Sequence, residues 1–275
     1  MAEHADLVTA DQSMGAQGSE LLRRLYFSKA QGIPSNEKDD RALVNLVLDH
    51  AKRVIRHPTH PTITEKDSFL RNPFGELDIE ELLEESPIVS DADDLVVTVK
   101  RDKPFTCVAL LEASSSMAVD KHLLASVAVA VLLLEVPSRD VSRTLFSSNA
   151  RTIKRVQTEE AVEATILKFL ATQPVGFTNI GEGLKAGLRE CNRLGTRRRK
   201  VALIATDGLT TEGVDPYDVA SEYDFLVVLH LHGPGSHLES SRAMAQKGKG
   251  VCLEVNHFED LPKKLYDALR LIARM

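Results

Sequence analysis

The stretch that decides the fold runs from Phe105 to Met117 and reads FTCVALLEASSSM. Its first part, Thr106–Leu111, is a short apolar run of the kind that forms a strand buried on both faces. The run is followed at once by Glu112 and then by two hydroxyl side chains, Ser114 and Ser116. This pattern predicts a polar site where a buried parallel strand ends.

Six segments downstream of residue 103 have the length and composition of strands. They are Thr106–Leu111, Arg143–Ser147, Arg151–Val156, Val201–Ala205, Phe225–Leu231 and Val251–Val255. Segments with helical spacing alternate with them: Lys121–Leu134, Glu159–Ala171, Ile180–Leu194, Tyr217–Ser221, Leu238–Lys247 and Phe258–Ala273. This alternation predicts a doubly wound α/β domain, with a mainly parallel six-stranded sheet covered on both faces. Charges at alternate positions of Arg151–Val156, after a very short turn, predict an antiparallel edge strand.

Two further polar positions lie at the ends of other predicted elements. Thr178 stands before the helix that begins at Ile180, and Asp207 follows the strand Val201–Ala205. In the common strand order 3-2-1-4-5-6, the loops after the first and fourth strands emerge side by side. We therefore expect one oxygen-rich cluster, with Asp207 in a loop outside the core. Its members are Glu112, Ser114, Ser116, Thr178 and Asp207.

Hard oxygens of this kind are what a small divalent cation such as Mg²⁺ or Mn²⁺ prefers. The sequence therefore favours a metal site over a catalytic one. For Thr178 an alternative stays open, in which it caps the helix and Glu182 is the acidic residue of the first turn.

These motifs resemble the metal-ion-dependent adhesion site (MIDAS) of the von Willebrand factor type A (VWA) domain. The family's pattern is Asp-x-Ser-x-Ser, then a Thr, then an Asp often followed by Gly, and Glu112–Ser116, Thr178 and Asp207 occupy those places. The resemblance covers about residue 105 to the C-terminus. It implies a Rossmann-like VWA fold and a protein-interaction module, not an enzyme, in which the metal captures an Asp or Glu of a partner protein. Further similarities to the family are Met117, Thr178–Gly181 and Thr206–Gly208.

Glu112 departs from the pattern, because the family has Asp at this position. The extra methylene lengthens the side chain by roughly 1.5 Å, whereas Mg²⁺ tolerates little error around bonds of about 2.0–2.1 Å. Two interpretations stay open. In one, the longer arm replaces or shifts a bound water of a working metal site. In the other, the site is vestigial and metal-free and still supports folding.

The chain before residue 103 differs in composition from the rest. Residues 1–100 carry 11 Lys or Arg against 19 Asp or Glu, whereas the remainder carries 23 against 21. We expect a disordered tail over 1–18, a helical, acidic N-terminal extension over 19–102 and the VWA-like domain over 103–275. Within the extension we expect helices over Glu20–Ala30, Asp39–Arg56 and Phe74–Glu85, and a loop or linker over Pro58–Asn72.

The strand-like segment Leu95–Lys100 needs a partner elsewhere, or crosses the surface, if the strand after it is central in the sheet. The extension also looks similar to a bacterial branch of the VWA family in which a short acidic segment precedes the domain, as in Pro73–Asp78. That resemblance implies a MoxR-type AAA+ ATPase as the partner.

An acidic stretch, Glu76–Asp94, holds nine acidic residues and no basic one. Its candidate docking site is the basic run Arg197–Lys200. This run precedes a strand, so we expect it at the end of the sheet opposite the polar cluster. A solvated basic surface is the default interpretation of this run, and docking of the acidic stretch is the alternative. The polar cluster is a competing target, where one carboxylate of the stretch could mimic a partner. Chain geometry favours the basic run, and surface ion pairs contribute only about 0–1 kcal/mol each, so we expect the stretch to act mainly as a tether for the N-terminal helices.

Composition argues against several other classes. The chain has no Trp and only 5% aromatic residues, which disfavours a stacking platform for single-stranded nucleic acid. The longest apolar run, Leu123–Leu134, is about a dozen residues long, and a membrane span needs about twenty, so we expect a buried helix and no membrane contact. Met1–Glu20 lacks the apolar centre of a secretory signal. Cys107, Cys191 and Cys252 lie far apart without a CxxC spacing, which indicates a reducing compartment, the cytoplasm.

Other chemistry receives weaker support. A serine-dependent hydrolase using Ser114–Ser116 is the alternative function, but the flanking residues do not form the GxSxG elbow. The glycines of Gly181–Gly187 lack dinucleotide-binding spacing and position, and the chain has no P-loop. His230 and His232 are two apart on a predicted strand, so with His237 they are candidates for a zinc site or for ordinary hydrogen-bonded histidines.

Overall fold

The computed structural model describes residues 37–54, 62–74, 76–80, 95–102, 105–117, 120–135, 141–195 and 198–256, with a few positions between 260 and 272. The chain divides into two units, one of residues 1–58 and 105–272 and one of residues 59–104 and 273–275. Several expectations lie outside the described residues: the tail over 1–18, the helix Glu20–Ala30, residues 81–94 of the acidic stretch and most of the helix Phe258–Ala273.

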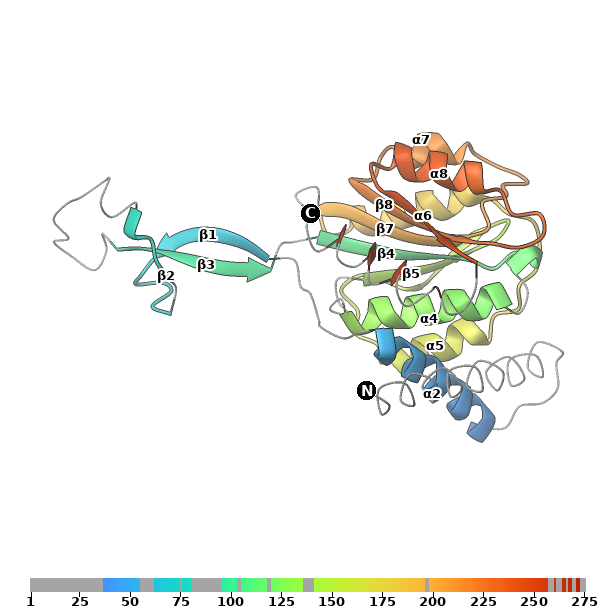
Figure 1. Cartoon of the computed structure of the whole chain (residues 1–275), viewed down its shortest axis with the longest axis horizontal. Helices are drawn as coiled ribbons and strands as arrows, with labels where there is room; N and C mark the ends of the chain where they lie inside the picture. Colours follow the sequence, from blue (N-terminus) through green and yellow to red (C-terminus); the bar gives the residue numbers. More distant parts are fainter. Residues whose placement is uncertain are drawn as a thin grey trace, which may run out of the picture. The chain divides into compact units, whose positions relative to one another are not determined.

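A six-stranded sheet forms the centre of the larger unit (Figure 1). In spatial order its strands are β6 (Ala150–Lys154), β5 (Val141–Phe146), β4 (Phe105–Glu112), β7 (Arg199–Thr206), β8 (Phe225–Leu231) and β9 (Val251–Val255). All neighbours run parallel except β5 and β6, which are antiparallel. Counted along the chain this is the order 3-2-1-4-5-6, with an antiparallel edge strand, so the predicted fold class is confirmed.

Helices cover both faces of this sheet (Figure 1). One face carries α4 (Asp120–Glu135), α5 (Val162–Leu170) and α2 (Glu37–Val54), and the other carries α6 (Ile180–Asn192), α7 (Pro216–Ala220) and α8 (Leu238–Lys247). Helix α4 is apolar on nearly every side because it lies between the sheet and the helices α2 and α5. The sheet therefore has an apolar core on each face.

Helix α2 overlaps most of the predicted helix Asp39–Arg56, begins two residues before it, and supplies one layer of this unit. Leu43, Val47 and Ala51 recur every four residues and are buried against α4 and α5. Burying a Leu or Val side chain stabilises a fold by about 1.5–3 kcal/mol. The N-terminal sequence thus contributes directly to the stability of the α/β unit.

The second unit contains a three-stranded antiparallel sheet in the order β1 (Thr62–Ser68), β3 (Val96–Asp102), β2 (Glu76–Leu77). The expectation that Leu95–Lys100 pairs outside the main sheet is confirmed. The loop expected over Pro58–Asn72 is wrong, because β1 pairs with β3 along its whole length. The helix expected over Phe74–Glu85 is wrong at β2. Strand β1 reads TITEKDS, and it lacks the apolar alternation by which a strand is normally recognised.

Candidate functional site

The carboxylate of Glu112 is the point at which the predicted site residues meet. Strand β4 ends at Glu112 and its neighbour β7 ends at Thr206, so the loops after both strands leave the same edge of the sheet. Glu112 Oε1 accepts hydrogen bonds from the hydroxyls of Ser114 and Thr178, the latter at 3.1 Å. The Ser116 hydroxyl is 3.5 Å from the same oxygen and 3.0 Å from Ser114 Oγ.

The other carboxylate oxygen of Glu112 contacts the end of β7. Glu112 Oε2 accepts a hydrogen bond from Thr206 Oγ1 at 2.5 Å and a longer one from the backbone N–H of Asp207 at 3.4 Å. The structure therefore brings all five predicted residues together and adds Thr206, which belongs to the family-like stretch Thr206–Gly208 but was not predicted as a site residue.

The loop that carries Thr178 is fixed by backbone bonds to the loop after β4. Val175 N–H donates to the carbonyl of Ala113 at 2.9 Å, and Ser115 N–H donates to that of Gly176 at 3.3 Å. Asn179, and not Thr178, caps α6, because its side-chain oxygen accepts the N–H of Glu182 at 2.9 Å. The capping alternative for Thr178 is wrong, and its hydroxyl binds Glu112 instead.

Asp207 forms an ion pair that the sequence did not predict. The ammonium of Lys121, in the first turn of α4, lies 2.9 Å from Asp207 Oδ2. The Lys121 side chain is 9% exposed and that of Asp207 is 0% exposed. The expectation that Asp207 lies outside the core is therefore wrong: a parallel strand buried on both faces ends here, and the loops around it exclude water.

Gly208 is required by the turn that follows Asp207. Its φ is +80°, and a Cβ at this position would lie 2.4 Å from the carbonyl oxygen of His237. The close approach allows His237 N–H to donate to the carbonyl of Asp207 at 2.7 Å. The Asp-Gly pair thus has a physical basis, because a larger residue would push the α8 loop away from the site.

Burial and charge act together on Glu112. Burial raises the pKa of its carboxyl, the nearby Asp207 carboxylate raises it further, and hydrogen bonds from Ser114, Thr206 and Thr178 lower it; the net direction is upward. The cluster therefore holds two buried acidic groups and one ammonium, from Lys121. That is one positive charge for two carboxylates.

The donor set fits a hard divalent cation in chemistry, because three hydroxyls and two carboxylates converge. Each donor is nevertheless already engaged by a protein group: the hydroxyls bind Glu112, and Asp207 binds Lys121. A +2 and a +1 charge about 4 Å apart repel by roughly 8 kcal/mol at an effective dielectric constant of about 20. The residues can hold such a cation if Lys121 leaves Asp207.

In the described part of the chain, no three His, Cys, Asp or Glu side chains are grouped to hold a metal ion. The zinc alternative for the histidines is therefore wrong. His230 is buried and its Nδ1 lies 2.9 Å from Ser241 Oγ, whereas His232 and His237 are exposed.

The geometry gives little support to the hydrolase alternative. Ser114 pairs with a carboxylate but is buried, and Ser116 is exposed but lies 3.5 Å from that carboxylate. Within the described residues no histidine bonds to either hydroxyl, so neither is an accessible serine with a well-placed base.

Exposed apolar side chains lie in two of the loops near the Glu112 cluster. Val175 is 60% and Phe177 is 66% exposed, in the loop that binds the backbone of residues 113–115. Val214 is also exposed, and it lies against the first turn of α6, where a Cβ at Gly181 would contact it. We refer to Val175, Phe177 and Val214 as the apolar rim.

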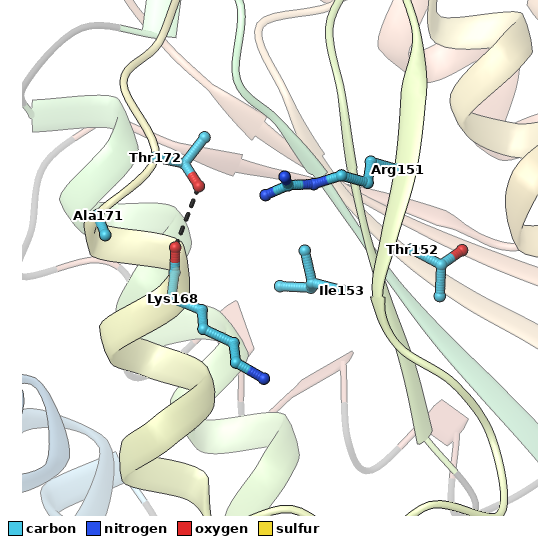
Figure 2. A pocket seen from close by; sticks show the side chains of 6 residues that line it. All are labelled: Arg151, Thr152, Ile153, Lys168, Ala171 and Thr172. Atoms are coloured by element: carbon cyan, nitrogen blue, oxygen red, sulfur yellow. Dashed lines mark hydrogen bonds between the residues drawn. The ribbon is translucent and has the colours of Figure 1, made fainter.

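A second hollow lies between β6 and α5, and none of the five site residues lines it. Figure 2 shows the Arg151 side chain extending from β6 toward α5, with Lys168 on the opposite wall. Lys168 forms an ion pair with Glu160, which leaves Arg151 as the cation available to a ligand. This hollow offers much less chemistry than the Glu112 cluster.

The sequence matches no protein-family model and no curated protein. Solved structures share the fold at low identity. An aerotolerance-related membrane protein from Bacteroides fragilis is 15% identical with a TM-score of 0.51, over 61% of this chain and 99% of that one. The protein BatB from Bacteroides thetaiotaomicron is 17% identical with a TM-score of 0.50, over 62% of this chain and 100% of that one.

Proximal thread matrix protein 1 from the mussel byssus, in a form with a zinc-occupied MIDAS motif, is 20% identical with a TM-score of 0.52. The alignment covers 62% of this chain and 48% of that chain, so the present chain corresponds to about half of the mussel protein. At these identities the likeness establishes the fold alone, which is that of VWA domains. Among the described residues, no helix has the length and apolarity needed to cross a membrane.

Proposed function

We propose that this chain is a protein-interaction module of the VWA type, which binds a partner protein at the carboxyl ends of β4 and β7. One observation carries the proposal. Polar groups from three loops converge on the buried carboxylate of Glu112, which lies 3.5 Å from the hydroxyl of the exposed residue Ser116; the loop that carries Thr178 also carries the exposed Val175 and Phe177.

The apolar rim favours a protein over a small solute as the ligand. Single exposed apolar side chains are common on proteins, but several of them in the loops near a polar cluster are typical of a binding surface, and aromatic residues are enriched where proteins bind one another. Phe177 has this exposure, and its loop is held by backbone bonds to the loop after β4. A partner that covers Phe177 therefore also reaches Ser116.

Metal-bridged capture is the finer part of the proposal. The hydroxyls of Ser114, Ser116 and Thr178 would hold Mg²⁺ or Mn²⁺, with Glu112 and Asp207 supplying charge directly or through water. When bound, the cation would offer an open position to an Asp or Glu of the partner. The zinc-occupied MIDAS motif in the mussel protein of the same fold supports this part.

A MoxR-type AAA+ ATPase is the partner that we propose, on the resemblance of the N-terminal sequence to one bacterial branch of VWA proteins. The wide separation of the three cysteines, none of which forms a disulfide in the described residues, supports a cytoplasmic location for such a pair.

Calorimetry with a MoxR-type ATPase from the same genome tests the proposal. We expect Phe177→Ser to weaken binding by about tenfold or more. The matched control is Leu134→Ser, which removes an exposed apolar side chain at the far end of α4. The same titration with EDTA in place of Mg²⁺ measures the contribution of the cation.

The expected result is weaker binding for Phe177→Ser and unchanged binding for Leu134→Ser. Equal affinities for wild type and Phe177→Ser would remove this edge of the sheet as the binding surface. Insensitivity to EDTA in both the wild type and Lys121→Met, which lacks the ammonium paired with Asp207, would reject the metal bridge and leave the binding surface in place if the effect of Phe177→Ser is retained.

A further inference from the structure

The ion pair between Lys121 and Asp207 occupies the place where the site needs positive charge. Lys121 Nζ lies 2.9 Å from Asp207 Oδ2, and no other cation bonds to this carboxylate in the described part of the chain. We propose that Lys121 competes with a divalent cation for Asp207, so that the site accepts the metal only when the ammonium moves away. The inference rests on the metal-bridged capture proposed above and deepens it into a form of regulation.

The position of Lys121 explains why its ammonium needs Asp207. Lys121 is in the first turn of α4, where the helix dipole disfavours a positive charge. Its side chain is 9% exposed, so water cannot stabilise the ammonium. A fully buried carboxylate at hydrogen-bond distance meets both needs. The pair is therefore a buried contact of the metal-free chain and not a surface contact that salt would screen.

The surroundings restrict where the ammonium can go. A Cβ at Gly233, in the loop after β8, would lie 2.7 Å from Lys121 Cε. The absence of a side chain at Gly233 thus makes room for the lysine stem along this loop. The loop lies at the surface, since Pro234 and Gly235 are exposed. An ammonium displaced from Asp207 can reach solvent in this direction.

Glu112 further stabilises the metal-free state of the cluster. Its Oε1 accepts hydrogen bonds from the hydroxyls of Ser114 and Thr178, and these hydroxyls are direct metal ligands in the proposed site. The metal-free cluster is thus complete in two respects: its hydroxyls have an acceptor, and Asp207 has a cation. A divalent cation gains access only by replacing both sets of contacts, which predicts weak binding to the wild-type chain.

Metal titrations of lysine variants test the competition. Lys121→Met removes the ammonium and keeps an unbranched side chain, and Lys121→Arg retains the positive charge. Lys185→Met is the matched control, because Lys185 is a half-buried lysine of α6 outside the site. Binding of Mg²⁺ and Mn²⁺ is measured by calorimetry and by the shift in melting temperature at about 1 mM metal.

We expect little shift for wild type, Lys121→Arg and Lys185→Met, and at least about tenfold tighter metal binding for Lys121→Met. If Lys121→Met does not fold without metal, Lys121→Gln serves instead, because its amide can still donate to Asp207. The double variant Lys121→Met/Asp207→Asn removes both charges and is expected to lose the gained affinity.

Equal metal affinity for wild type and the uncharged Lys121 variants would overturn the competition while leaving the metal site intact. Absence of metal binding in every variant would overturn both the competition and the metal bridge. The effect of Phe177→Ser on partner binding is independent of these outcomes, so the binding surface is tested separately.

Discussion

Two groups of buried charged side chains belong to the same sheet: the Glu112 cluster at the end of β4, and Arg143 with its neighbours in β5. They differ in how many of their charged atoms have a hydrogen-bond partner. At the end of β4, Glu112 and Asp207 accept hydrogen bonds from hydroxyls, backbone N–H groups and an ammonium. Inside β5, Arg143 is also fully buried, yet its Nε and one terminal nitrogen have no partner among the described residues.

The difference follows from the elements that carry the two clusters. Arg143 belongs to β5, and its side chain reaches α5. There the hydroxyl of Thr165 accepts its hydrogen bond, and the carboxylate of Glu160 is 3.7 Å away. Burial lowers the pKa of Arg143 to about 10. The Glu112 cluster lies where several loops meet, and loops can supply as many donors as the carboxylates need. Strand ends are therefore the better place for a site that exchanges partners.

The largest effect that we expect on the first cluster comes from Asp207→Ala. This change leaves the Lys121 ammonium buried without a counter-charge, and such a loss destabilises a fold by about 3–5 kcal/mol. Urea unfolding measures it. The double variant Lys121→Met/Asp207→Asn should recover much of the loss, because no charge is then left unpaired. A loss below about 1 kcal/mol for Asp207→Ala would mean that the ammonium finds water in the folded chain.

A change in the loop after β7 tests whether loop geometry distinguishes the Glu112 cluster from the Arg143 cluster. We expect Gly208→Ala to destabilise the fold by at least about 2 kcal/mol, from strain at positive φ together with the contact to His237. Gly235→Ala is the control: its φ is +76°, but no atom lies within 4 Å of the added Cβ. Similar losses for both variants would show that the contact has no part in the effect.

A third buried ionisable group, His122 of α4, tests whether burial without an ion pair is enough to keep a side chain uncharged. Its ring stacks on Phe169 with centroids 4.1 Å apart, and burial lowers its pKa from 6.5 to about 4. The folded chain keeps His122 neutral, whereas the unfolded chain takes up a proton below pH about 6.5. The stability from His122 is thus full above pH 6.5 and is lost as the pH falls toward 4.

We expect the free energy of unfolding of the wild type to fall by about 2 kcal/mol between pH 7 and pH 5 because of this group. His122→Gln should lack that part of the fall. Chemical unfolding of both proteins at the two pH values measures the difference. Parallel curves would mean that His122 is protonated in the folded state.

The smallest effect concerns the second cluster. Arg143→Met should change the stability by no more than about 1 kcal/mol, because an incompletely partnered buried charge is replaced by an apolar side chain of similar length. Lys121→Met, the equivalent change in the first cluster, should cost several times as much, because it leaves Asp207 unpaired. Equal losses for the two variants would contradict the distinction between the clusters.

The fold of the α/β unit could be predicted because buried parallel strands are continuous apolar runs, as β4 and β7 are. The same principle explains the failure at β1, because its polar sequence contains no such run and the strand is defined by its backbone pairing with β3. The convergence of the five site residues could also be predicted, since strand order alone brings the loops after β4 and β7 together.

The ion pair of Lys121 with Asp207 could not be predicted from strand order. A lysine at the start of an apolar helix normally extends into water, and only the path of the side chain past Gly233 shows that it does not. Thr206 was missed for a similar reason, because a threonine at the end of a strand is equally suited to packing and to hydrogen bonding. Both residues act through three-dimensional neighbours that have no fixed spacing in the sequence.

The docking of α2 has a consequence for the order of folding. Helix α2 is synthesised before the other described elements of its unit, but α4 begins 66 residues after α2 ends (120 − 54) and α5 begins 108 residues after it (162 − 54). Its apolar face therefore stays uncovered until α4 and α5 have been synthesised. Closing so long a loop has an entropic cost that rises only slowly with length, so the delay mainly affects the rate and not the final stability. A nascent chain released before α4 would expose Leu43 and Val47 and would be a target for chaperones or proteases.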